Sequence, residues 1–279
     1  MKKRHEAFGL VVSLALALSA CATGDDGDDL DFDDGIAFRT LDAGSGDLSG
    51  GEETDAKKGV PSGGGWLNNG LENPVTSGID PAFALSTAAG LSDEGLAADP
   101  QFRSTVEYVV ECALPDGDSI TKIIDDVVVT FYGKHGLAPA WKDGACDQDC
   151  QEWVSACVLA RTNQSGENVM VWMQADHPAI GFGVPGEAIL EAGFFGNLFV
   201  ATDEKFYCKG APTGNVAAKR EGRTCSSPTN PCEFQKFNSC DGRCELVGPN
   251  LDVPANCYPG NGGGSGEQSY HTISTYITE

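Results

Sequence analysis

Eleven cysteines limit the folds open to this chain, because each disulfide holds two positions within about 7 Å of each other. One cysteine, Cys21, stands alone near the N-terminus, and the others lie between Cys112 and Cys257. Cysteines pair in exported proteins, whereas in a reducing cytosol they more often bind metals or catalyse. The compartment in which the chain folds therefore decides what these residues build.

The N-terminus has the pattern of a secretory signal peptide. Lys2, Lys3 and Arg4 form a positive start, and an almost wholly apolar run follows from Phe8 to Leu18. A bilayer-spanning helix needs roughly 20 apolar residues, so this run is too short, and no longer run follows it. We therefore expect export and no transmembrane helix.

Leu18-Ser19-Ala20-Cys21 resembles the lipobox of bacterial lipoprotein precursors. The resemblance implies that signal peptidase II removes residues 1–20 and that acyl chains on Cys21 anchor the chain to membrane lipid. Two or more acyl chains hold a protein firmly. Ala22 follows where inner-membrane lipoproteins of many Gram-negative bacteria carry Asp, which favours the outer membrane, with the domain periplasmic or surface-exposed. An ordinary signal peptide is the alternative.

The cysteine count supports this assignment, because setting Cys21 aside leaves an even number of the eleven. The disulfide candidates are Cys112, Cys146, Cys150, Cys157, Cys208, Cys225, Cys232, Cys240, Cys244 and Cys257. Cys150 and Cys157 lie about 10 Å apart if they share a helix, so they cannot pair with each other. Cys112 is our first choice for Cys157, and Cys146 with Cys150 could close a small ring.

The net charge of -23 excludes nucleic acid as a partner, because like charges repel. Much of the acid lies in Asp25–Asp34, a like-charge block of the kind that stays solvated. With the Gly- and Ser-rich residues after it, this block predicts a disordered acidic linker through residue 65. A calcium loop starting at Asp29 is the alternative, but Thr40 stands where an EF-hand needs glutamate.

Residues 66–279 are predicted to form a single disulfide-rich globular domain of the α+β class, because helical and strand patterns alternate without a regular βαβ order. Its helix and strand core is expected over 100–207, with a loop-rich, cysteine-rich part over 208–260. The stretch 66–99 reads as mostly loop, with a short helix near 80–88.

Three helices are predicted within the core. Asp99-Pro100 reads as a helix start, and apolar residues at helical spacing follow up to Ala113. Asp149 and Glu152 form a capping-box pattern, which starts a second helix near Cys150 that runs to Arg161. Residues 187–199 read as a short helix broken by glycines.

The strand candidates are rich in β-branched and aromatic residues. Residues 120–132 predict a strand or hairpin with a turn at Asp125-Asp126, and 168–174 predict another strand. Residues 270–278 alternate like an exposed or edge strand.

Several stretches resemble an uncharacterised group of cysteine-rich exported bacterial lipoproteins. They are Cys112-Ala-Leu-Pro, Gly136-Leu-Ala-Pro-Ala-Trp141, Trp153-Val-Ser-Ala-Cys157-Val-Leu-Ala-Arg161 and Gly193-Phe-Phe-Gly-Asn197. The resemblance implies a shared fold and no activity.

Catalysis and metal binding have little support in the sequence. The residues around Cys150 are weakly similar to the helix start of papain-like proteases, with His177 and Asn197 in the right chain order for a thiol hydrolase. Zinc is the competing use of the spacings Cys146-x3-Cys150 and Cys240-x3-Cys244. His135, His177 and His271 show no paired metal-ligand spacing, so we assign no catalytic residue, metal or cofactor.

The remaining hypotheses are a binding module, a structural protein of the envelope and, less favoured, a secreted hydrolase of the thiol or carboxylate type. Trp66, Trp141, Phe194 and Phe195 could bind a carbohydrate or protein ligand if exposed, although filling the core is the favoured role. The binding-module hypothesis predicts a shallow aromatic groove without titratable groups. The hydrolase predicts a pocket where a histidine meets a free thiol or paired carboxylates.

Overall fold

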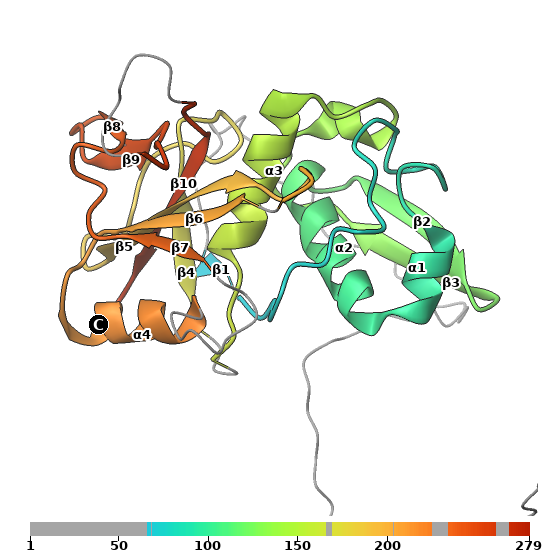
Figure 1. Cartoon of the computed structure of the whole chain (residues 1–279), viewed down its shortest axis with the longest axis horizontal. Coiled ribbons are helices and arrows are strands. Elements are labelled where there is room, and N and C mark those ends of the chain that lie inside the picture. Colours follow the sequence, from blue (N-terminus) through green and yellow to red (C-terminus); the bar gives the residue numbers. More distant parts are fainter. Residues whose placement is uncertain (1–65, 68, 166–168, 203, 225–233, 261–267) are drawn as a thin grey trace, which may run out of the picture. The chain divides into compact units, whose positions relative to one another are not determined.

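The computed structural model places one helix, α3 (Gln148–Ala160), between two groups of elements (Figure 1). It describes residues 66–67, 69–165, 169–202, 204–224, 234–260 and 268–279, all within the compact unit Asp55–Glu279. The predicted signal peptide, Cys21 and the acidic linker lie outside the described residues. The fold combines helices with antiparallel sheets and is of the α+β class, as predicted.

The first group contains the helices α1 (Asp93–Ala98) and α2 (Pro100–Ala113). Asp99 caps α2, because its carboxylate accepts a hydrogen bond from the Gln101 N–H, and Pro100 occupies the first helical position. This confirms the predicted helix. The helix predicted at 80–88 is absent, and turns occupy that segment; α1 was not predicted.

α3 begins two residues earlier than predicted. Asp147 is the capping residue, and its carboxylate accepts from the Cys150 N–H at 3.1 Å. Glu152 does not close a capping box; it is buried and accepts hydrogen bonds from Gln148, Gln268 and the His271 N–H. Nearly every residue of α3 from Glu152 onward is buried, because the sheet lies against one side of the helix and α2 against another.

The second group is a sheet with the strand order β1-β4-β10-β5-β6-β7. The strands are β1 (Trp66–Leu67), β4 (Val171–Gln174), β5 (Ile189–Asn197), β6 (Glu204–Lys209), β7 (Gln235–Phe237) and β10 (Thr272–Ile277). All pairs are antiparallel except β6 with β7. The strand predicted at 168–174 is therefore confirmed as β4.

Two sequence predictions for this sheet are wrong. The segment predicted as a glycine-broken helix is the strand β5, in which Gly193 lets the Cys208 sulfur approach to 3.1 Å from where a Cβ would lie. Strand β10 lies between β4 and β5 rather than at an edge, and all its residues are buried. Its Ser274 hydroxyl donates to the Pro254 carbonyl, which offsets the cost of burying a polar group.

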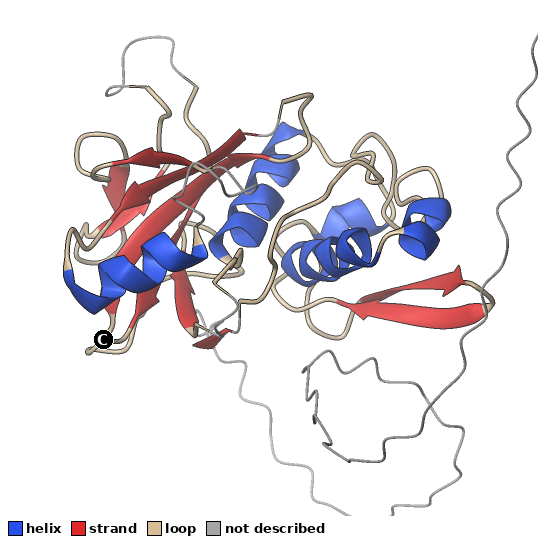
Figure 2. Cartoon of the chain, turned by 60° about the horizontal axis from the view of Figure 1, so that its bottom comes forward, coloured by secondary structure: helices blue, strands red, loops and turns tan. Residues whose placement is uncertain are grey.

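The predicted hairpin is formed by β2 (Ser119–Ile124) and β3 (Val127–Tyr132). Asp125 and Asp126 make its turn with φ of 50° and 64°, the left-handed backbone that two-residue hairpin turns require. In Figure 2 the hairpin lies at the right, with helices on one of its faces.

The cysteine-rich part contains more structure than predicted. Helix α4 (Gly214–Arg223) lies in its first section, and β8 (Glu245–Val247) pairs with β9 (Val253–Ala255). Its remaining described residues are mostly turns and loops, which agrees with the prediction.

Four disulfides connect these elements. Cys112 pairs with Cys157 and Cys146 pairs with Cys150, as the helix geometry suggested. The other two are Cys208–Cys240 and Cys244–Cys257. Cys225 and Cys232 lie outside the described residues. The Cys112–Cys157 bridge fastens α2 to α3, and a loop of 45 residues is worth about 4 kcal/mol in the chain-entropy model.

Candidate functional site

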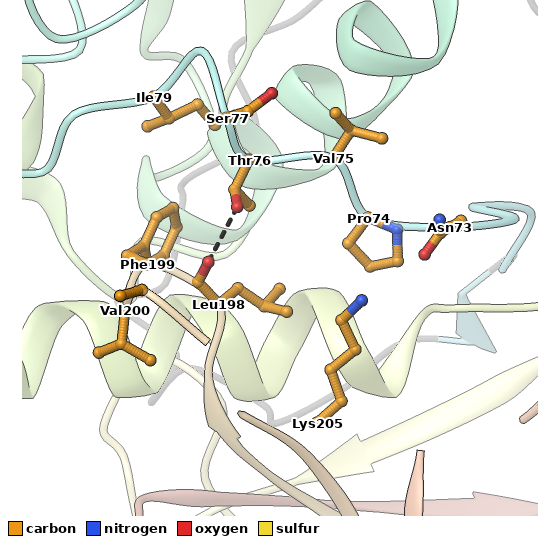
Figure 3. Close-up of a pocket in the computed structure, with 11 residues that line it drawn as sticks. Asn73, Pro74, Val75, Thr76, Ser77, Ile79, Leu198, Phe199, Val200 and Lys205 are labelled. Atoms are coloured by element: carbon orange, nitrogen blue, oxygen red, sulfur yellow. Dashed lines mark hydrogen bonds between the residues drawn. The ribbon is translucent and has the colours of Figure 1, made fainter. Parts of the chain in front are cut away.

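A groove of about 470 Å³ lies between the loop after β1 and the loop after β5 (Figure 3). This volume falls within the range of about 300–1,000 Å³ that is usual for ligand sites. The apolar residues of its walls are Pro74, Val75, Ile79, Leu198, Phe199, Val200 and Ala201. We call it the 74/199 groove.

Both walls are fixed to helices. The Val75 N–H donates to Thr105 of α2, and the Leu198 N–H donates to Ser155 of α3, each at 2.9 Å. The Thr76 hydroxyl donates to the Leu198 carbonyl at 2.8 Å and so joins the walls to each other (Figure 3). The groove is therefore largely formed before any ligand enters, which lowers the entropic cost of binding.

The groove combines apolar side chains with the hydroxyls of Thr76 and Ser77 and the ammonium group of Lys205. Asn73 Oδ1 is buried and has no hydrogen-bond partner among the described residues. A buried acceptor of this kind costs free energy until an N–H or O–H group reaches it. None of the described lining residues is histidine, cysteine or a carboxylic acid. The groove is therefore suited to binding, and its described lining holds no pair of a histidine with a thiol or a carboxylate.

A separate cluster of polar and aromatic side chains lies at the start of α3. His271 Nε2 is 2.6 Å from the Asp149 carboxylate, and the imidazole stacks on Trp153 with ring centroids 4.3 Å apart. His177 contacts the same indole edge-on at 4.9 Å and accepts a hydrogen bond from the Ala179 N–H. The sequence separation of these residues is too great for any local pattern to predict the cluster.

Burial lowers the pKa of His177 below its ordinary value, because the charged imidazole loses hydration. The nearby His271 lowers this pKa further, and Asp149 opposes the shift. A carboxylate–imidazole pair such as Asp149–His271 can orient a general base. Among the described residues, however, no hydroxyl or thiol hydrogen-bonds to either imidazole, so the cluster holds no activated nucleophile.

The structure contradicts the thiol-hydrolase hypothesis. Cys150 is bonded to Cys146, so it has no free thiol to form the nucleophilic thiolate. Asn197 is directed elsewhere, because it donates to Gln151 and accepts from the Phe199 N–H. Asn197 and His177 both lie near the start of the helix, but the bridged Cys150 offers them no thiolate to assist.

The zinc hypotheses fail for the same reason. Zinc needs deprotonated thiols, and both members of each predicted pair are bonded in disulfides. Cys208, Cys240 and Cys244 do gather within 4.8 Å of one another, because two bridges lie side by side. Their closest unbonded sulfurs, those of Cys208 and Cys244, are 3.5 Å apart.

The aromatic residues considered as ligand contacts belong mainly to the core. Trp141, Phe194 and Phe195 are at most 1% exposed, so they fill the interior, as favoured, rather than bind a ligand at the surface. Trp66 lies in β1, and its side chain is outside what the structure describes. The groove aromatic is Phe199, whose ring meets Trp141 edge-on at 5.3 Å.

Sequence reasoning missed the 74/199 groove, because its walls come from segments 122 residues apart. The short apolar runs Pro74-Val75 and Leu198-Phe199-Val200 were the available signal, but exposure cannot be read from them. His135, to which the sequence assigned no role, has its Nε2 buried without a hydrogen-bond partner among the described residues.

Comparison of the chain with protein-family models, with curated proteins and with solved structures finds no match in any of the three. Within the described residues, no helix has both the length and the apolar character to cross a bilayer. The inference of function therefore depends on the residues themselves.

Proposed function

We propose that this chain is a lipid-anchored protein of the bacterial cell envelope, held at the outer membrane through acylated Cys21, and that its domain is a binding module. The lipobox pattern Leu18–Cys21 behind a signal peptide supports the anchor. The even number of cysteines that remain agrees with folding in an oxidising compartment. The acidic linker would hold the domain away from its anchor.

The 74/199 groove carries the proposal of binding. Its walls are preformed, and their apolar side chains lie beside the polar groups of Thr76, Ser77 and Lys205, a mixture that is usual for ligand sites. An extended peptide supplies both apolar side chains and backbone N–H groups. A carbohydrate fits less well, because the ring of Phe199 packs on Trp141 instead of forming a free stacking platform. We therefore propose a peptide segment of another envelope protein as the ligand.

The anchor is tested by Cys21→Ser in the full chain, expressed in a Gram-negative host. We expect the wild-type chain to partition into the detergent phase of Triton X-114 and its N-terminal peptide to carry the mass of acyl groups. The variant should lose both properties, because serine offers no thiol to acylate. Ser13→Ala, which leaves the lipobox intact, should behave as wild type. Membrane retention of an unacylated Cys21→Ser chain would contradict the proposal.

The groove is tested with a phage-displayed library of linear peptides selected on the wild-type chain. Selected peptides should bind Val200→Lys at least about tenfold more weakly, because the lysine puts a charge among apolar contacts. Ile189→Lys is the matched control, since Ile189 is 37% exposed and Val200 is 38% exposed. Equal binding to both variants, or no selected peptide, would reject the peptide-binding function. It would favour the structural role instead.

A further inference from the structure

The outer edge of β3 is exposed and unusually suited to pairing with another strand. Its sequence, Val127-Val-Val-Thr-Phe-Tyr132, contains only β-branched and aromatic residues and no charge. Val128 is 67% exposed and Tyr132 is 53% exposed, although both are large and apolar. Soluble proteins usually protect such an edge with lysine, proline, a bulge or a covering element.

The backbone groups along this edge can be assigned from the hairpin register. The Gly133 N–H donates to the Asp118 carbonyl, which makes this cross-strand pair a hydrogen-bonded one. Hydrogen-bonded and non-bonded pairs alternate in an antiparallel ladder, so the bonded residues of β3 are 127, 129 and 131. The N–H and C=O groups of Val128, Thr130 and Tyr132 therefore point away from β2. Within the described residues, these groups form no backbone hydrogen bond.

The hairpin is held in place while this edge stays free. Phe131 is buried on the inner face, where α2 lies against β3. Lys122 of β2 donates from the same inner face to the carbonyls of Thr87 and Leu91. The edge is thus presented by a fixed element, and among the described residues no third strand joins this two-stranded sheet.

We propose that β3 pairs antiparallel with β3 of a second copy of this chain, about a twofold axis at Thr130. Bonded pairs form between residues whose backbone groups point outward, and an axis at Thr130 pairs all three of them: Thr130 faces the partner's Thr130, and Val128 faces the partner's Tyr132. Threonine pairs and aromatic–β-branched pairs are among the favourable cross-strand contacts. A twofold interface requires such self-complementarity.

Charge at the two ends of the strand favours the same register. Asp126 in the hairpin turn lies four residues before the axis, and the exposed Lys134 lies four residues after it. Both residues lie just beyond the strand, and the Lys134 N–H is bonded to carbonyls at the end of α2, so the contact at each end of the pair is between the Asp126 side chain and the side chain of the partner's Lys134. A strand from an unrelated protein would have to supply both the apolar pattern and the opposite charges. A second copy supplies them necessarily.

Edge pairing covers little surface, so the dimer should be weak in solution and require a concentrated sample. Sedimentation of the full chain carrying Cys21→Ser, which removes the acyl site, should show a concentration-dependent dimer. Thr130→Lys should lower the association constant at least about tenfold, because two lysines would face each other at the axis.

Thr121→Lys is the matched control. Thr121 is the cross-strand partner of Thr130, their hydroxyls are 3.3 Å apart, and both lie on the same outer face. Both variants lose this contact, but Thr121 lies on the other edge, so its variant should still dimerise. Dissociation by both variants alike would overturn the β3-edge interface, as would a wild-type chain that stays monomeric at every concentration.

The register has its own test. Lys134→Glu should weaken the dimer, because Asp126 would then face the partner's glutamate. Asp126→Asn combined with Lys134→Glu should recover most of the lost association, since asparagine suits the left-handed turn and removes the repulsion. Thermal melting of each variant verifies that the domain is folded. Equal dimerisation by Lys134→Glu and wild type would exclude this register.

Discussion

His135 shows how one partly buried residue can set the response of the domain to acid. Its pKa falls from 6.5 to about 3, chiefly because burial penalises the charged ring and also because Arg161 and Lys134 are positive. The folded protein therefore keeps His135 neutral, while the unfolded chain takes up a proton below pH 6.5. Above that pH, His135 should make no pH-dependent contribution to the free energy of unfolding. This free energy should fall as the pH drops from 6.5 toward 3.

His135→Phe removes this contribution, because phenylalanine cannot titrate. Between pH 7 and pH 4.5 the wild type should lose about 2 kcal/mol more unfolding free energy than the variant. Urea denaturation at the two pH values measures the difference, and acidic groups common to both chains cancel. Equal losses in the two chains would show that His135 is solvated or protonated in the folded state.

At the scale of the element, the sequence predicts best where local signals and tertiary contacts agree. Helix α2 has its Asp99 cap and Pro100 start, and the β2–β3 hairpin has β-branched strands around the Asp125-Asp126 turn. Helix geometry excluded a Cys150–Cys157 bridge, and Cys112, the first choice for Cys157, is its partner. The helix and the hairpin could be predicted because the residues within each segment carry the signal.

Elements whose form depends on distant partners were missed. The glycines of β5 resembled helix breaks, but Gly193 accommodates the Cys208–Cys240 bridge, and Gly196 has a φ of 133° that favours glycine. The serine and threonines of β10 suggested a solvent-facing edge, but the strand is central. The 74/199 groove and the Asp149–His271 pair form only when the chain closes over long separations, so no local pattern could predict them.

At the scale of the whole molecule, one buried guanidinium connects four elements. Arg223 at the end of α4 pairs with Glu191 of β5, and neither side chain is exposed. It also donates to the carbonyls of Ala160 and Thr162 at the end of α3, while Thr275 of β10 donates to Glu191. The arrangement joins the sheet to both helices that contact β5, so its charge balance should affect the stability of the entire domain.

Arg223→Leu should therefore destabilise the domain by about 3–5 kcal/mol, because it leaves the Glu191 carboxylate buried without its cation. The double variant Glu191→Leu with Arg223→Leu should be more stable than this single variant, since an apolar pair of similar volume avoids the cost of an unpaired buried charge. Urea unfolding at neutral pH, monitored by tryptophan fluorescence, measures both. Glu191→Leu alone completes the comparison. If the losses of stability in Glu191→Leu and Arg223→Leu simply add in the double variant, packing and not the charge pair determines the contribution of Arg223. If the double variant regains stability relative to Arg223→Leu, the loss in that single variant comes from the unpaired Glu191 charge. The role of Arg223 at the junction of the four elements is then to balance that charge.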